Sequence, residues 1–226
     1  MFRVQKLLSK YGYCSRRKAE QLIQEGRVKV NGKVITIGDQ ATENDKISVD
    51  DKIVKGQRLV YLMFNKPLGC VTALTDSTFD TIMDYIDIKE RVFPIGRLDY
   101  NTSGLLLLTN DGDFANKVMH PRYETNKTYL VGLQNPIKDK DLDKIRGGIS
   151  LDDGMTSPAK VKRKNSTMLE ITIHEGKNRI LRRIFEKLGY KVKFLQRIKV
   201  GKLGLGNLKP GKYKQLTKED LDLIFL

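Results

Sequence analysis

The sequence predicts an α+β fold divided into two domains. Its 226 residues suffice for a small module joined to a medium-sized one. Segments with strand-like alternation and segments with helical spacing follow one another in an order too irregular for a doubly wound parallel sheet. Residues 52–58 carry little periodicity and are typical of a linker. We therefore expect a small domain at residues 1–51 and a larger one at residues 59–226.

Two short helices are expected at the start of the small domain. Apolar residues at helical spacing give each helix a buried face: Val4, Leu7, Leu8 and Tyr11 in the first, and Ala19, Leu22 and Ile23 in the second. Gly12 ends the first helix, and Ser15 is placed to cap the second. A β-hairpin follows, because Val28 and Val30 alternate with charged residues and Asn31-Gly32 is a strong hairpin turn signal.

Three consecutive cations, Arg16, Arg17 and Lys18, stand at the start of the second helix. The unpaired backbone amides of a helix start favour an anion, so these side chains would reinforce the binding of a phosphate group. A solvated helix face is the alternative interpretation of such a triplet.

The larger domain alternates β-rich segments with short helices. Strands are expected at residues 59–64, 105–108 and 169–173, and residues 180–188 have the spacing of a helix. Lys209-Pro210-Gly211 predicts a turn. Asn110-Asp111-Gly112 predicts a turn and a helix start, which we prefer to a metal site at Asp111 and Asp113.

The charge composition indicates a polyanionic partner. The chain has 42 Lys and Arg against 27 Asp and Glu, a formal net charge of +15. Nucleic acid is the first candidate and an anionic membrane the second. The chain lacks an apolar run of about 18 residues and a signal peptide. We therefore expect a soluble, cytoplasmic protein without a membrane partner.

Neither a metal nor a cofactor is expected. Cys14 and Cys70 are isolated in the sequence, as are His120 and His174, so none of them forms a metal-ligand pattern, and we interpret all four as structural. No glycine-rich stretch has the spacing of a nucleotide-binding loop.

The densest group of unusual residues is the loop Gly96-Arg97-Leu98-Asp99, which leads into the apolar strand at residues 105–108. It places charged groups at the edge of a core, where pKa values are readily perturbed. On the residues alone, Asp99 is either a catalytic carboxylate or a turn-forming residue that binds nearby amides.

Two family resemblances cover nearly the whole chain. Residues 2–50, with their helix pair, basic turn and V-x-V-N-G-K hairpin, resemble the S-four RNA-binding domain, which binds structured RNA. The larger domain resembles the RsuA type of pseudouridine synthase in four motifs, in order: N-K-P-L-G, G-R-L-D-x-x-T-x-G-L-L-L-L-T-N-D-G, K-T-Y-L-V and E-G-K-N-R-x-x-R-R. Ile180 departs from the pattern, since relatives carry Gln there.

The second resemblance implies an enzyme that isomerises uridine in ribosomal RNA without a cofactor. It implies a synthase domain with a mixed, largely antiparallel sheet and flanking helices. It assigns Asp99 as the catalytic carboxylate, Arg182 as the cation that keeps Asp99 ionised, and Tyr129 as the ring that stacks on the uracil. Without the family resemblance, the interpretation of Tyr129 would be an ordinary aromatic residue of a strand. Arg183 is the alternative to Arg182.

The RNA contacts are expected from basic residues around these motifs. They are Arg16, Arg17, Lys18, Lys66, Arg97, Lys177, Arg179 and Arg183. Arg97 would fill the space vacated by the flipped uridine or hold an adjacent phosphate; a structural ion pair is the alternative. Residues 160–199 contain 13 basic residues against Glu170, Glu175 and Glu186, a net charge of +10, which predicts salt-sensitive phosphate contacts.

The sequence motifs resemble most closely the RluB/RluF-like branch, whose members act on large-subunit (23S) rRNA. We expect a monomeric enzyme whose partner is structured rRNA, free or in an assembly intermediate. A non-catalytic RNA-binding or ribosome-assembly factor that retains the synthase fold is the alternative. The combination of Asp99, Tyr129 and Arg182 favours the enzyme, because a protein that only binds RNA has no need of it.

Overall fold

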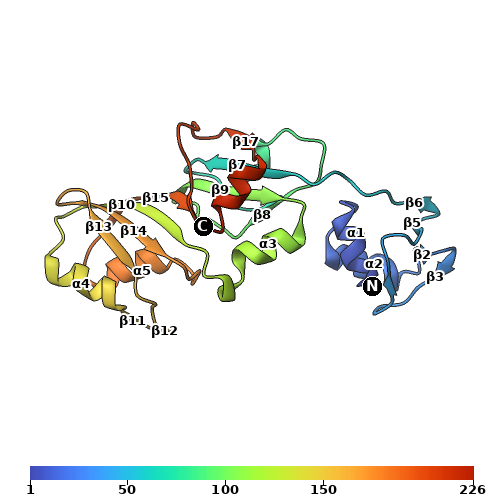
Figure 1. Cartoon of the computed structure of the whole chain (residues 1–226), viewed down its shortest axis with the longest axis horizontal. Coiled ribbons are helices and arrows are strands. Elements are labelled where there is room, and N and C mark those ends of the chain that lie inside the picture. Colours follow the sequence, from blue (N-terminus) through green and yellow to red (C-terminus); the bar gives the residue numbers. More distant parts are fainter. The chain divides into compact units, whose positions relative to one another are not determined.

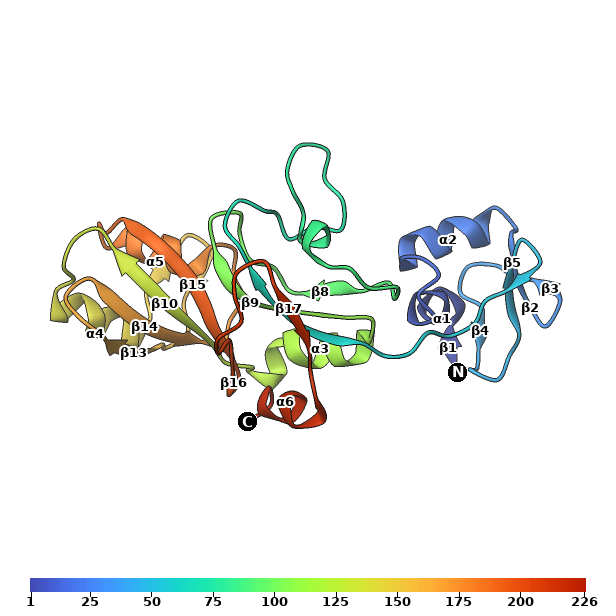
Figure 2. The same cartoon turned by 90° about the horizontal axis from the view of Figure 1, so that it is seen from above.

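The computed structural model describes all residues, 1–226. It divides into two compact units (Figures 1 and 2). Unit 1 comprises Met1–Val60 with the short segments Ile88–Phe93 and Thr109–Gly112, and unit 2 comprises the remainder. No helix is long and apolar enough to cross a membrane.

Unit 1 contains the two expected helices, α1 (Val4–Lys10) and α2 (Arg16–Gln24), and small strands. Strands β2 (Val28–Val30), β3 (Lys33–Val34), β5 (Ile47–Val49) and β6 (Lys52–Ile53) form an antiparallel sheet in the order β3-β2-β5-β6, and β1 (Phe2–Arg3) pairs with β4 (Gln40–Ala41). The apolar positions expected to face inward form one core, including Leu7, Ala19 and Val28.

The local signals in unit 1 produce the expected structures. The hydroxyl of Ser15 accepts a hydrogen bond from the backbone N–H of Lys18 (3.2 Å), which caps α2. Asn31 and Gly32 both have positive φ, 50° and 83°, as a two-residue hairpin turn of this hand requires.

The expected linker at residues 52–58 is wrong in its first part. Residues 52–53 form β6, which pairs with β5, and Val54 packs against the core of unit 1. The later linker residues contact segments distant in sequence: Gln57 exchanges two hydrogen bonds with the backbone of Arg91, and Asn110 binds the backbone of Arg58 and Val60. Contacts with partners 34 or more residues away leave no periodic signal in the sequence of the linker itself.

Unit 2 is built on a nine-stranded mixed sheet. Its main order is β13-β14-β10-β15-β9-β7-β17, with β16 beside β15 and β8 beside β9. The strands are β7 (Tyr61–Lys66), β8 (Phe93–Ile95), β9 (Ser103–Thr109), β10 (Lys127–Leu133), β13 (Lys160–Arg163), β14 (Met168–Ile173), β15 (Val192–Val200), β16 (Leu203–Gly204) and β17 (Tyr213–Gln215). Only β9 and β15 pair in parallel among the registered pairs, so the predicted mixed, largely antiparallel sheet is confirmed.

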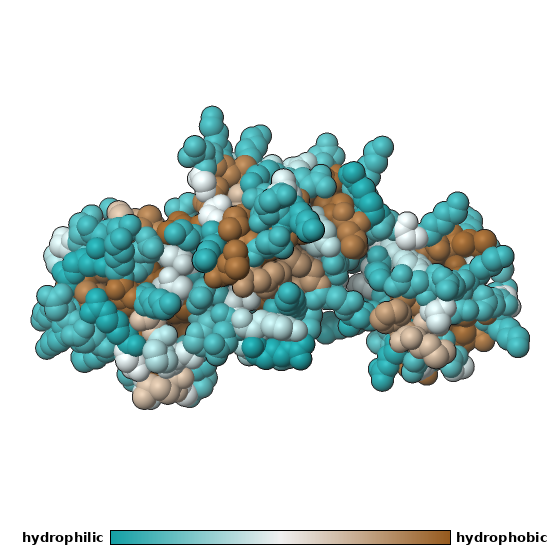
Figure 3. Space-filling model, in the orientation of Figure 1, coloured by the Kyte–Doolittle hydropathy of each residue, from teal (hydrophilic) through white to brown (hydrophobic).

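Helices flank this sheet and a small hairpin projects beside it. They are η1 (Ile82–Tyr85), α3 (Gly112–Met119), η2 (Pro121–Tyr123), α4 (Asp139–Gly147), α5 (Ile180–Lys187) and α6 (Lys218–Leu223), with the hairpin β11 (Ser150–Leu151) and β12 (Gly154–Met155). Helices α4 and α5 lie beside strands β10, β14 and β15 (Figure 1), and their apolar side chains form one core with those of the strands. Most of the molecular face in Figure 3 is hydrophilic, as the charge composition requires.

The parallel contact between β9 and β15 depends on Gly104. This residue has φ +105°, and a Cβ atom there would lie 2.2 Å from the carbonyl oxygen of Arg197. Only glycine allows the two backbones to approach so closely. The loop that carries Asp99 leads directly into β9, so Gly104 fixes where that loop ends relative to β15.

Candidate active site

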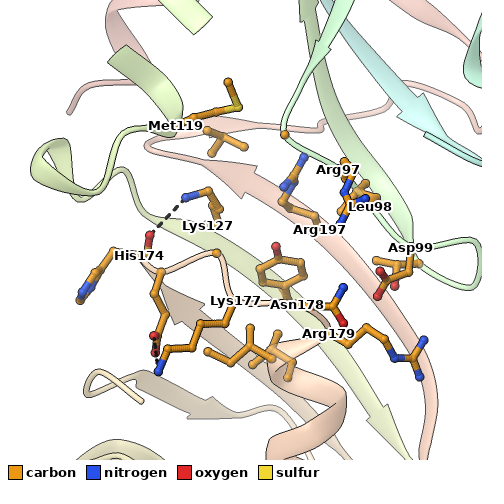
Figure 4. A pocket seen from close by; sticks show the side chains of 18 of the residues that line it. Arg97, Leu98, Asp99, Met119, Lys127, His174, Lys177, Asn178, Arg179 and Arg197 are labelled. Carbon is orange, nitrogen blue, oxygen red and sulfur yellow. Dashed lines mark hydrogen bonds and ion pairs between the residues drawn. The ribbon is translucent and has the colours of Figure 1, made fainter. Parts of the chain in front are cut away.

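A pocket of about 800 Å³ lies within unit 2. Several chain segments surround it, among them the loop from Ile95 to Asp99, strands β9, β10 and β15, and the segment from His174 to Leu181. Apolar side chains such as Leu107, Leu195 and Val200 line part of the wall, and charged groups line the rest (Figure 4). Such a combination suits a ligand with an apolar ring and polar substituents.

Asp99 lies in the turn between β8 and β9. Its carbonyl oxygen accepts a hydrogen bond from the N–H of Thr102 (2.9 Å), which closes the turn. The preceding residue, Leu98, is buried, and its backbone N–H and C=O both bind the hydroxyl of Thr72 (3.2 and 2.7 Å). The half-buried Asp99 side chain is therefore carried on a backbone fixed on both sides and lines the pocket.

Lys66 supports this loop from inside the protein. Its side chain is fully buried, and Nζ donates to the carbonyl oxygens of Pro67 (3.0 Å) and Thr102 (3.1 Å). Burial lowers the pKa of Lys66, while the nearby Cys70 and Asp99 oppose that shift. The expected RNA contact at Lys66 is therefore wrong for this structure, because a buried amine that holds two carbonyls cannot reach a phosphate.

Arg182 and Arg183 have different partners. Nη2 of Arg182 donates to the carbonyl oxygen of Asn101 (2.5 Å), and its buried Nε has no hydrogen-bond partner. Burial and the neighbouring Arg179 lower the pKa of Arg182, and the negative charge of Asp99 opposes them. Arg183 instead binds both carboxylate oxygens of Asp153 (2.6 and 2.9 Å). Of these two arginines, Arg182 is thus the one whose charge interacts with that of Asp99.

Tyr129 lies on β10, between Ile171 of β14 and Arg197 of β15 in the strand register. Its half-buried ring packs against the hydrophobic core and lines the pocket. An aromatic face held in this way can stack on a planar base.

The other predicted RNA contacts divide between the two units. Arg97, Lys177 and Arg179 line the pocket, and Arg97 is exposed. Lys177 is partly engaged, because its Nζ donates to the carbonyl oxygen of Met155 (2.8 Å) and lies 3.6 Å from the carboxylate of Glu175. Arg16, Arg17 and Lys18 are exposed at the start of α2 in unit 1 and do not line the pocket.

Several pocket residues were not assigned from the sequence. Lys127 and Arg197 line the pocket, as does His174, which the sequence led us to interpret as structural. The position of Lys127 in the K-T-Y-L-V motif could have indicated a place in the site. Arg197 has no such signal, because it stands in a segment with the ordinary alternation of a strand. Ile180, the departure from the family pattern, also lines the pocket and is otherwise buried.

Comparison with known proteins agrees with the fold and with these motifs. The profile of the RNA pseudouridylate synthase family matches residues 60–187, and that of the S4 domain matches residues 2–47. A chain with this sheet, this pocket and both matches is a synthase joined to an RNA-binding module: it belongs to the RNA pseudouridylate synthase family and carries an S4 domain.

Individual relatives align over almost the full length. An uncharacterized RNA pseudouridine synthase of Aquifex aeolicus is 46% identical over 232 residues, covering 99% of this chain and 93% of its own. The ribosomal large subunit pseudouridine synthase B of Bacillus subtilis is 44% identical over 230 residues, covering 98% and 94%. A crystal structure described as a pseudouridylate synthase superposes with a TM-score of 0.74 at 31% identity, covering 99% of this chain and 100% of that one.

Proposed function

We propose that this protein converts a specific uridine of ribosomal RNA to pseudouridine, and that its target lies in the large subunit. Family membership and the name of the B. subtilis relative support the proposal. The net charge of +15 suits a partner of this kind. The S4 domain would bind structured RNA, and unit 2 would perform the reaction. We expect the protein to act as a monomer in the cytoplasm, where ribosomes are made.

The reaction sets clear demands on the site. The bond from the ribose to N1 of uracil breaks, the base rotates, and a new bond forms from the ribose to C5. C5 then loses its proton, and N1 gains one. No atom is gained or lost between substrate and product, so no external group has to be supplied. A carboxylate that acts as nucleophile or base, in a site shielded from water, meets the central demand.

The observation that carries the proposal is that Asp99 lines the pocket and has the cation of Arg182 nearby. Asp99 lines the pocket, and Arg182 lies close enough for the two charges to influence each other while it holds the backbone of Asn101. A cation so placed stabilises the ionised carboxylate. Tyr129, in the wall of the same pocket, would stack on the uracil.

Access to the uridine requires that it leave its stack in the folded RNA, at a cost of a few kcal/mol. Arg97 is exposed and also lines the pocket. It would occupy the vacated stack or bind the adjacent phosphate, and Lys177, Arg179 and Arg183 would contact the surrounding backbone.

The test is a map of pseudouridine across all rRNA, made by carbodiimide modification and primer extension, in cells with and without this protein. We expect one signal, or a few, to disappear from the large-subunit rRNA and to return when the wild-type gene is supplied. A signal lost from the small subunit would contradict the subunit assignment alone. An unchanged map in both subunits would contradict the enzymatic function and favour a binding role.

A further inference from the structure

Lys127 and Arg197 bring two cations to one part of the pocket wall. Both side chains line the pocket, from the neighbouring strands β10 and β15. Arg197 is 4% exposed, and Lys127 is half-buried. Neither of them forms an ion pair with a carboxylate. Two neighbouring like charges without a counterion, one of them buried, are costly.

The structure fixes the amine of Lys127 but leaves it with unused capacity. Nζ donates to the carbonyl oxygens of Thr125 (3.0 Å) and His174 (3.2 Å). An ammonium group has three N–H donors, so one remains for a ligand. Burial, with the positive charge of Arg197 as a second cause, lowers the pKa of Lys127 to about 8. Both causes disfavour the charged form of this amine, and a bound anion would favour it.

Arg197 is fixed in a comparable way. Its Nε donates to the carbonyl oxygen of Leu105 (2.7 Å), which ties the side chain to β9. Its guanidinium has further N–H donors at its two terminal nitrogens. No side-chain acceptor is bonded to them, and the residue lines the pocket.

The acidic residues of the pocket do not neutralise this pair. The carboxylate of Glu175 accepts from the backbone N–H of Ser157 (2.7 Å) and lies near Lys177. Glu124 lines the pocket without an ion pair to either cation, and its charge does not figure among the causes that shift the Lys127 pKa. The negative charge of Asp99 instead raises the pKa values of Arg182 and Lys66 against the effect of burial. In the view of Figure 4, Lys127 and Asp99 lie at opposite sides of the pocket.

We propose that Lys127 and Arg197 form a phosphate-binding subsite, which holds a backbone phosphodiester of the RNA within one nucleotide of the target uridine. This inference rests on the proposed function and extends it. The volume of about 800 Å³ accommodates more than a base, and a phosphodiester supplies the single negative charge that the two cations lack. A phosphate bound at the side of the pocket opposite Asp99 would fix the ribose and leave the base free to rotate.

The experiment replaces single phosphates of a short RNA substrate by uncharged methylphosphonates, at the two positions that flank the target uridine and at one position several nucleotides away. For the wild-type enzyme we expect kcat/KM to fall at least tenfold at one flanking position, and less than threefold at the distant one. Losses below threefold at both flanking positions would overturn the subsite. Failure to isomerise the unmodified RNA would instead contradict the proposed function.

Protein variants then assign the phosphate to its partners. Lys127→Gln should lower kcat/KM on unmodified RNA. With this variant, the methylphosphonate at the sensitive position should lower kcat/KM less than twofold further, because the cation that binds this phosphate is already gone. Lys127→Arg should keep the sensitivity. Lys162→Gln removes one charge from the exposed edge strand β13, and its effect should add to that of the methylphosphonate. Additive effects for Lys127→Gln would overturn the assignment.

A thermal melt of each variant checks its fold. If Lys127→Gln does not fold, Arg197→Gln takes its place in the same cycle, because it also removes one of the two charges that would bind the phosphate. The phosphate scan of the wild-type enzyme decides the existence of the subsite without any variant.

Discussion

Arg182 donates a hydrogen bond of 2.5 Å to the carbonyl oxygen of Asn101, the second residue after Asp99. The helix α5 thereby holds the turn that carries the candidate catalytic carboxylate. Adjacent residues of a helix point in directions about 100° apart, and Arg183 accordingly leaves this turn and binds Asp153 on the β11–β12 hairpin.

The different partners of these two arginines predict different consequences of their loss. Arg182→Ala should lower the single-turnover rate of isomerisation by at least tenfold, about 1.4 kcal/mol in barrier, because Asp99 loses its nearby cation and the turn loses an anchor. Arg183→Ala should change that rate less than threefold, since it removes a half-exposed ion pair of small energetic value. Arg182→Lys should recover part of the loss. A greater loss of rate for Arg183→Ala than for Arg182→Ala would show that Arg183, and not Arg182, is the cation that supports Asp99.

Asp99→Asn should abolish isomerisation while the fold and most of the RNA affinity remain. Asparagine keeps the size of the side chain but cannot attack as a nucleophile or serve as a base. Affinity should survive because it comes from phosphate contacts of many Lys and Arg residues. Single-turnover conversion, filter binding and a thermal melt are measured on the same preparation. A variant rate within about tenfold of wild type would make Asp99 a structural turn residue.

Lys66→Met should destabilise the protein without changing the salt dependence of RNA binding. The substitution removes the donor to the carbonyl oxygens of Pro67 and Thr102, at a cost of about 2 kcal/mol and a Tm lower by roughly 4–8 °C. Lys209→Met, at an exposed position, serves as the control and should leave the Tm nearly unchanged. A shallower salt dependence for Lys66→Met, with an unaltered Tm, would restore the direct phosphate contact.

The stability of the free protein should depend on pH through Lys127. Its pKa of about 8 in the folded protein lies below the value of about 10.4 for an unfolded lysine. Between these values the unfolded chain binds more protons, so the stability of the wild type relative to Lys127→Met should rise with pH, by up to about 1.4 kcal/mol per unit. Urea unfolding of both proteins at pH 7 to 10 measures it, and other titrating groups, including those of the pocket, cancel in the difference. A difference that stays constant over this range would show that Lys127 has an ordinary pKa.

The basic start of α2 should contribute to RNA affinity rather than to chemistry. Replacing Arg16, Arg17 and Lys18 by Gln should weaken RNA binding and reduce the slope of log Kd against log salt by about 2, since each phosphate contact contributes about 0.7–0.9. The rate at saturating enzyme should stay within threefold of wild type, because these residues do not line the pocket. The control triple replaces Lys33, Lys46 and Lys52, which are also exposed in unit 1. Equal slopes for the two triples would mean that α2 has no special role.

Local patterns in the sequence determined much of the fold. The spacing of Leu7 and Leu8, the cap at Ser15 and the Asn31-Gly32 turn each act within a few residues, and the structure confirms all three. The helix that carries Arg182 is confirmed for the same reason. The motif resemblance also identified the family, because it depends on residue types in order along the chain.

Tertiary structure alone decided which of the basic side chains face the pocket. Lys66 stands in a family motif yet is buried beneath the Asp99 turn, whereas Arg197 stands in an ordinary strand and lines the pocket. The parallel pairing of β9 with β15 brings Arg197 beside Gly104, 93 residues earlier in the chain. The sequence does not distinguish a lysine or arginine that donates to a buried carbonyl from one that lines the pocket. Burial and hydrogen-bond partners arise only when distant segments pack together.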